Sequence, residues 1–147
     1  MGRASFTVTI DRPPDEVFAF VADLRNLDSW YPAIAGAVLI AGQPGEVGSQ
    51  FDLTTERESG IAGGDVIRYT TESVQPGVSI VFVADTASAV ADTYELTPVD
   101  DGTELRYTID VAHRGWRAPL GPLIDRAARI GLRPLGGALK RRLEPEP

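Results

Sequence analysis

The sequence of 147 residues predicts an α+β domain, with two short helices after the first strand and a long helix at the end of the chain. Residues 5–11 alternate strictly between polar and apolar side chains, which is typical of a half-buried strand. Residues 33–111 contain apolar stretches separated by Gly, Pro and Asp, which indicates an antiparallel sheet. Residues 116–143 return to a helical period. The length favours a single domain over residues 1–147.

The first strand and the two short helices follow directly from the order of residue types. Alternation places Phe6 and Ile10 on the core side of the strand. Pro14 and the two acidic residues after it suit the first turn of a helix, whose positive end favours carboxylates. Apolar side chains then recur at helical spacing up to Leu24. Residues 26–32 predict a second short helix or turn that ends before a proline.

Six more strands are predicted, each bounded by turn residues. Their ranges are 35–41, 48–57, 64–75, 78–86, 90–98 and 104–113. The strongest hairpin signal lies between the last two, at Asp101-Gly102, because glycine tolerates the positive φ of tight turns. With the first strand, these six make a sheet of seven strands.

The final segment, residues 116–143, places its apolar side chains on one stripe of a helix. Pro134 lies inside this pattern and predicts a kink or a split into two helices. Most of the chain's basic residues fall in 114–147, although the net charge of the whole chain is −7. We therefore expect a basic helix docked on an acidic body, with its exposed cations solvated. Contact with a membrane or a partner is the alternative use of these cations.

The composition excludes several kinds of site. The absence of cysteine excludes disulfides, thiolate zinc sites, iron–sulfur clusters and cysteine nucleophiles. A single histidine, His113, excludes a multi-histidine metal site, and we expect neither a metal nor a cofactor. The acidic charge argues against nucleic acid as a partner. No apolar run is long enough for a membrane span or a secretory signal, so we expect no integral membrane association and a cytoplasmic location.

Several short motifs occur together along the chain. They are the segment PDEVFAFVAD at residues 14–23, Leu27-x-x-Trp30-x-Pro32, Gly45-x-x-Gly48, Asp101-Gly102-Thr103 with Leu105 and Tyr107, and the Leu/Arg-rich last segment. With them, the sequence resembles the START-like helix-grip superfamily, also called SRPBCC, and within it the polyketide cyclase/dehydrase and lipid-transport type. The resemblance covers essentially the whole chain and implies a curved seven-stranded antiparallel sheet wrapped around the long C-terminal helix, with an apolar cavity between them. Members include polyketide ring-shaping enzymes, carriers of lipids or quinones and hormone receptors, so the fold leaves the chemistry open.

The cavity side of this fold supplies candidate ligand-binding residues. Alternation assigns to the inner face Phe51, Leu53, Thr55, Ile67, Tyr69, Thr71, Ile80, Phe82, Ala84, Tyr94, Leu96, Leu105, Tyr107, Ile109 and Val111. Trp30 and Tyr31 lie where the resemblance places the short helix beside the cavity, and Ile124 and Gly131 belong to the apolar stripe of the last helix. Apolar walls with a few hydroxyls suit a hydrophobic small molecule, and ordinary core packing is the alternative role of these residues.

Three ionisable residues share the inward phase. Asp92 and His113 are candidate general acid or base groups, because a carboxyl in an apolar site has a raised pKa and histidine titrates near neutral pH. Both lie near predicted strand ends, where contact with solvent is the alternative. Arg57 can offer a charge-assisted hydrogen bond to a ligand, or it can form surface ion pairs with the neighbouring Glu56 and Glu58.

The leading hypothesis is therefore a carrier, sensor or regulatory protein that binds a lipid, quinone or polyketide in the cavity between sheet and helix, as a monomer or a homodimer. The alternative is a cyclase/dehydrase-like enzyme that uses Asp92 or His113 for proton transfer and tyrosine hydroxyls to hold an enolate.

Overall fold

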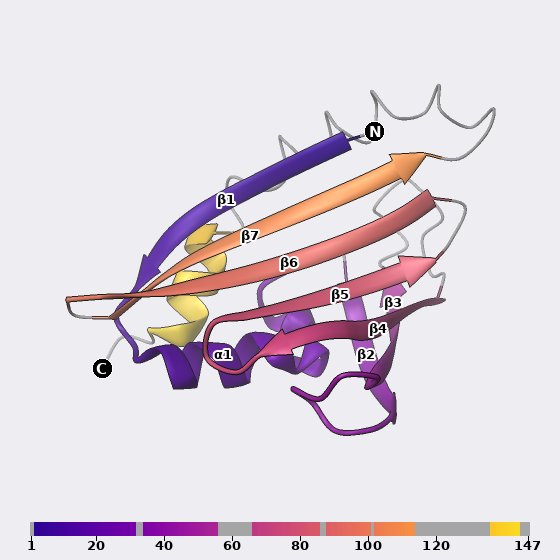
Figure 1. Cartoon of the computed structure of the whole chain (residues 1–147), viewed down its shortest axis with the longest axis horizontal. Coiled ribbons are helices and arrows are strands. Elements are labelled where there is room, and N and C mark those ends of the chain that lie inside the picture. Colours follow the sequence, from indigo (N-terminus) through magenta and orange to yellow (C-terminus); the bar gives the residue numbers. More distant parts are fainter. Residues whose placement is uncertain are drawn as a thin grey trace.

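Seven antiparallel strands form one curved sheet in the computed structural model of the chain (Figure 1). The strand order is β1-β7-β6-β5-β4-β3-β2, so the first strand lies beside the last. The structure describes residues 2–31, 34–55, 66–85, 88–100, 102–113 and 136–144. The strands are β1 (Gly2–Ile10), β2 (Ile34–Ala41), β3 (Gln50–Thr55), β4 (Val66–Gln75), β5 (Ser79–Asp85), β6 (Ser88–Val99) and β7 (Gly102–His113).

The two short helices form where the sequence predicts them. Helix α1 (Pro14–Ala22) begins with a proline in its first turn and buries Val17 and Val21 against the core. The 3₁₀ helix η1 (Leu24–Ser29) follows at once. Its start is capped by the side chain of Asp23, which accepts a hydrogen bond of 3.0 Å from the backbone N–H of Arg25. This tight connection folds η1 back toward the sheet.

Glycines with left-handed backbone form two of the predicted turns. Between β2 and β3, Gly42, Gly45 and Gly48 have φ angles of 71°, 86° and 90°. Gly77, between β4 and β5, has a φ of 76°. Because a Cβ disfavours this conformation, these turns explain both the predicted breaks and the Gly45-x-x-Gly48 motif.

The turn between β6 and β7 forms at the predicted place, with Val99 opposite Gly102. The predicted reason for the glycine was wrong, because the φ of Gly102 is not left-handed. Space is the actual reason: a Cβ at this position would lie 2.1 Å from the carbonyl oxygen of Ile10, at the end of β1. Glycine lets the backbones of β1 and β7 approach each other closely.

The core lies between the inner face of the sheet and the helices. The inner side chains that are buried there are Phe51, Leu53, Thr71, Ile80, Phe82, Ala84, Asp92, Tyr94, Leu96, Leu105, Tyr107 and Val111. Ile67, Tyr69 and Ile109 are half-buried, and the side chain of Thr55 lies outside the described residues. The period-2 assignment of the inner face is thus confirmed wherever side chains are described.

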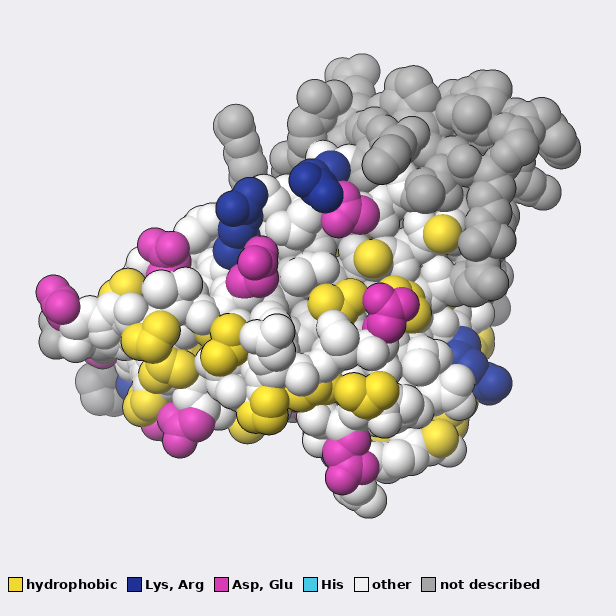
Figure 2. Space-filling model, in the orientation of Figure 1, with side chains coloured by type: hydrophobic (Ala, Val, Ile, Leu, Met, Phe, Trp, Pro, Cys, Tyr) yellow, Lys and Arg dark blue, Asp and Glu magenta, His cyan; other side chains and the backbone are white. Residues whose placement is uncertain are grey.

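The outer face of the sheet carries ion pairs instead. Arg3 and Asp110 pair across β1 and β7 with an N–O distance of 2.6 Å, and Arg68 pairs with Asp52 at 2.9 Å across β4 and β3. Figure 2 shows hydrophobic side chains scattered among charged ones over the face in view. Among the exposed hydrophobic residues of the sheet, Val38 on β2 is 62% exposed. Because charged and hydrophobic side chains are mixed on the outer face, the inner face is the more apolar of the two faces of the sheet.

The end of the C-terminal helix, residues 136–143, lies against the core (Figure 1). Leu139 is completely buried, and Lys140 donates a hydrogen bond of 2.7 Å to the carbonyl oxygen of Thr9 on β1. Arg142 stacks over the ring of Phe20 on α1 at 5.3 Å. These basic side chains therefore dock the helix on the sheet and α1. The rest of the predicted helix, with Pro134, lies outside the described residues.

Candidate functional site

A carboxyl group is buried on the inner face of the sheet. Asp92 lies well inside β6, between Phe82 of β5 and Ile109 of β7, and only 8% of its surface is exposed. The alternative that Asp92 is a solvated strand-end residue was wrong, because β6 begins at Ser88 rather than at residue 90. Among the residues that the structure describes, no donor reaches the Oδ1 atom of Asp92. Such an unpaired buried acceptor is uncommon and points to a ligand or a proton as its partner.

All four tyrosines of the chain lie close enough to this carboxyl for its charge to affect their pKa values. Tyr31 follows η1, Tyr69 lies on β4, Tyr94 on β6 and Tyr107 on β7. Burial raises the pKa of every one of these phenols, and the charge of Asp92 raises each pKa further. The pKa of Tyr31 reaches about 12. The hydroxyls therefore stay protonated at neutral pH, and we call these five residues the Asp92–tyrosine cluster.

The environment of Asp92 makes its carboxyl titrate near neutral pH. Burial raises the pKa of Asp92 to about 7, far above the ordinary value of 3.8. The Tyr107 hydroxyl opposes this rise in pKa by hydrogen bonding to the carboxylate, and the negative charge of Asp110 on the outer face adds to it. A carboxyl with such a pKa can both take up and release a proton at neutral pH, as a general acid or base must.

Aromatic rings continue from the cluster along the inner face. The rings of Tyr94 and Tyr107 lie 4.9 Å apart between centroids, and Phe82 meets Tyr94 edge-on at 6.0 Å. Trp30 is buried, with its ring 6.5 Å from that of Tyr107 and 5.6 Å from that of Tyr31. The structure thus brings together the predicted wall residues that follow η1 and those of the sheet. The predicted Phe51 and Leu53 are buried beside them in the same core cluster.

The side chains of four predicted site residues lie outside the described part of the structure. Arg57, Ile124 and Gly131 lie outside the described residues. His113 ends β7, where its backbone lies opposite Ser88 of β6, and its side chain is also outside the described part. The second predicted acid–base group therefore stays a prediction.

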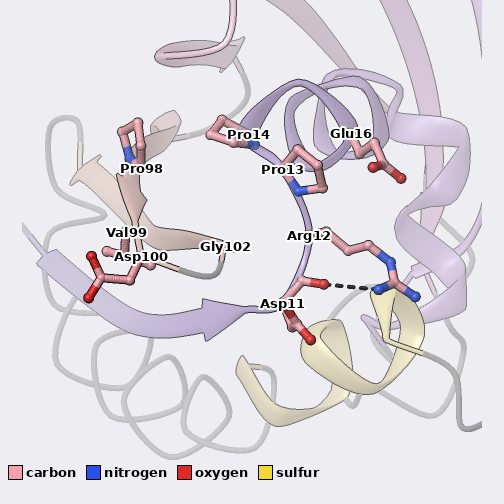
Figure 3. Close-up of a pocket in the computed structure, with 9 residues that line it drawn as sticks. All are labelled: Asp11, Arg12, Pro13, Pro14, Glu16, Pro98, Val99, Asp100 and Gly102. Atoms are coloured by element: carbon pink, nitrogen blue, oxygen red, sulfur yellow. Dashed lines mark hydrogen bonds between the residues drawn. The ribbon is translucent and has the colours of Figure 1, made fainter.

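A hollow of about 750 Å³ opens away from this cluster, at one end of the sheet (Figure 3). It lies between the start of α1 and the β6–β7 turn, and is lined by Asp11, Arg12, Pro13, Pro14, Glu16, Pro98, Val99, Asp100 and Gly102. Most of these residues are exposed, and the guanidinium of Arg12 is turned to the Asp11 carbonyl at 2.9 Å. No sequence signal predicted this hollow. Its exposed lining lacks the buried polar group that distinguishes the Asp92–tyrosine cluster.

The described part of the chain holds neither a metal-binding cluster nor a membrane-spanning helix. Within the described ranges, no three acidic or histidine side chains gather in a way that could hold a metal ion. None of the helices in that part of the chain is long and apolar enough to cross a membrane.

Comparison with known proteins gives the family. No functionally curated protein is significantly similar in sequence. A START superfamily protein from Mycobacterium smegmatis has a similar structure, with a TM-score of 0.76 at 22% identity over 98% of both chains. The di-domain ARO/CYC protein BexL of the BE-7585A biosynthetic pathway has a TM-score of 0.75 at 19% identity, over 98% of this chain and 47% of BexL. The protein Ara h 8.0201 has a TM-score of 0.72 at 17% identity, over 99% of this chain and 100% of that one.

These likenesses show the fold, and they confirm the helix-grip architecture expected from the motifs. Residues 1–144, nearly the whole chain, match the family described as polyketide cyclase/dehydrase and lipid transport. The chain therefore belongs to the polyketide cyclase/dehydrase and lipid transport family.

Proposed function

We propose that this protein binds a small hydrophobic ligand on the inner face of its sheet, with the polar end of the ligand at the Asp92–tyrosine cluster. The observation that carries the proposal is a buried carboxyl with an unpaired oxygen, set among tyrosine hydroxyls and aromatic rings. Apolar walls supply the burial energy of such a ligand, while a few polar groups fix its orientation. Membership in a family that includes lipid transport supports the same function.

Bound ligand should be detectable directly. We expect an organic-solvent extract of the purified protein to contain a lipid, quinone or polyketide, identified by mass spectrometry. Adding the matching compound at about 100 times its Kd should stabilise the fold by about 2.7 kcal/mol, measured as a rise in Tm. An empty preparation whose Tm ignores a panel of all three compound classes would contradict the proposal.

A second candidate function is supported by the titration of Asp92 near pH 7. In an aldol-type cyclisation, the Asp92 carboxylate would remove a proton from a carbon next to a ligand carbonyl. The resulting enolate would then add to a second carbonyl of the same molecule, and the proton would return to the new alkoxide. Tyrosine hydroxyls would donate hydrogen bonds to the enolate oxygen. The structural likeness to an ARO/CYC protein is consistent with this chemistry.

This candidate is tested with a reactive polyketide substrate. We expect Asp92→Asn, alone or with His113→Gln, to lower kcat by about 10²- to 10⁴-fold, the usual effect of losing acid–base catalysis. Asp52→Asn, which removes a half-buried carboxylate that pairs with Arg68 on the outer face, serves as the control and should keep full turnover. Unchanged turnover in the double variant would exclude the enzymatic role of both residues and leave the binding function.

A further inference from the structure

We propose that the Asp92–tyrosine cluster selects a neutral ligand whose polar end donates a hydrogen bond, a phenol or an alcohol, and rejects carboxylates and phosphates. This inference rests on the proposed binding function and names the head group that the site accepts. Asp92 would be the residue that determines this specificity.

Asp92 has unfilled hydrogen-bonding capacity. Its Oδ1 atom is buried, and no donor among the described residues reaches it. A buried acceptor without a donor is costly, and a ligand that brings a donor removes that cost. A ligand that brings only acceptors, such as an ether or an ester, does not.

The charges around Asp92 disfavour an anionic ligand. The groups in the described part of the chain that affect the Asp92 carboxyl are Tyr107, which donates a hydrogen bond, and Asp110, which is negative and lies on the outer face paired with Arg3. No cation from those described residues contributes to its pKa. An anionic head group would thus meet a carboxylate in a site of low dielectric, where like charges repel strongly.

The phenols of the cluster supply donors for the oxygen of a ligand. Their raised pKa values keep all four hydroxyls protonated, and since the O–H of Tyr107 is directed to Asp92, those of Tyr31, Tyr69 and Tyr94 can donate to a ligand. A phenol or alcohol uses both kinds of partner, because its O–H donates to Asp92 while its oxygen accepts from a tyrosine. The cluster is therefore complementary to a hydroxyl group.

Three probes that share one apolar body test the inference: naphthol, methoxynaphthalene and naphthoate. They present a donor, an acceptor without a donor, and an anion. Titration calorimetry of the full chain at pH 8, where an Asp92 carboxyl with a pKa of about 7 is mostly ionised, should give naphthol a Kd about 10-fold or more below that of methoxynaphthalene, with naphthoate the weakest. Equal binding of naphthol and either of the other probes would overturn the inference while leaving the proposed function intact.

Two variants separate the role of Asp92 from a general effect of the apolar walls. Asp92→Asn removes the negative charge at nearly constant volume, so we expect naphthoate to bind about 10-fold more tightly and the advantage of naphthol to shrink. Asp52→Asn, on the outer face, should leave the order of the three probes unchanged. Circular dichroism confirms that each variant is folded. If Asp92→Asn binds the three probes with the same relative affinities as the wild type, Asp92 does not determine the specificity. If none of the three probes binds folded wild-type protein, the proposed function itself is overturned.

Discussion

Replacing Asp92 with asparagine is expected to stabilise the protein at pH 8. In the folded state the pKa of Asp92 is about 7, whereas the ordinary value is 3.8. A raised carboxyl pKa means that the folded state holds its proton more tightly than the unfolded state. The contribution of Asp92 to the free energy of unfolding is therefore most favourable below about pH 4, falls between about pH 4 and 7, and is least favourable above pH 7. The difference between the two pKa values corresponds to about 4 kcal/mol of stability. This is the upper limit of the increase in the free energy of unfolding that Asp92→Asn can give at pH 8.

Urea unfolding of both proteins near pH 4, 6 and 8 measures this effect. Subtracting the free energy of unfolding of the wild type from that of the variant removes the effect of every other titrating group. This difference should decrease toward pH 4. Asp52→Asn is the matched control, because Arg68 lowers the pKa of the Asp52 carboxyl and the effect on stability has the opposite direction. A destabilised Asp92→Asn at pH 8 would show that the carboxylate has partners in the folded state that outweigh its burial.

Such a gain would fit the proposed role of Asp92. A carboxyl that lowers stability is typical of a functional site, where activity can require a residue that destabilises the fold. The stability measurement and the binding measurement thus examine the same residue independently.

The second large effect is expected from Gly102→Ala. A Cβ there would lie 2.1 Å from the carbonyl oxygen of Ile10, and neither backbone can move without disturbing the pairing of β1 with β7. We expect a loss of about 3 kcal/mol or more in the free energy of unfolding, as is typical of overpacking against a rigid neighbour. Thermal or urea unfolding measures it.

Gly36→Ala is the matched control for this variant. Gly36 lies on the edge strand β2, where a methyl group would meet nothing within 4 Å, and its φ is not left-handed. Alanine should be tolerated there within about 0.5 kcal/mol, or should stabilise slightly by restricting the unfolded chain. Equal losses in the two variants would mean that the close approach of β1 to Gly102 is not what requires glycine.

Much of the fold could be predicted because local chemistry determines it. The alternation of Phe51 and Leu53 on β3, and of Tyr94 and Leu96 on β6, indicated the inner face correctly, since successive strand residues point to opposite sides. The boundaries were less accurate. The Thr86-Ala87-Ser88 turn signal placed the start of β6 two residues late, and this shift made Asp92 look like a strand-end residue.

The cluster itself could not be predicted, because alternation gives the face of a residue but not its neighbours on adjacent strands. Those neighbours depend on the register between strands. The register of β5 and β6 places Asp92 opposite Phe82, and the register of β6 and β7 places Tyr94 opposite Tyr107. Tyr31 joins the cluster through the packing of η1, which is a long-range contact. The sequence therefore indicated which side chains face inward, and the tertiary structure decided which of them surround the carboxyl.

The position of β1 beside β7 also bears on how the chain folds. Gly2 pairs with Val111 and Ile10 with Thr103, so this ladder joins residues separated by nearly the whole described sheet. Contacts of such high sequence separation form slowly, because the entropic cost of closing a long loop comes before any of these contacts stabilises the chain. The hairpins from β2 to β7 can assemble from local contacts first. The first strand to be made must therefore wait for the last one, and the inner face stays open on that side until β1 docks.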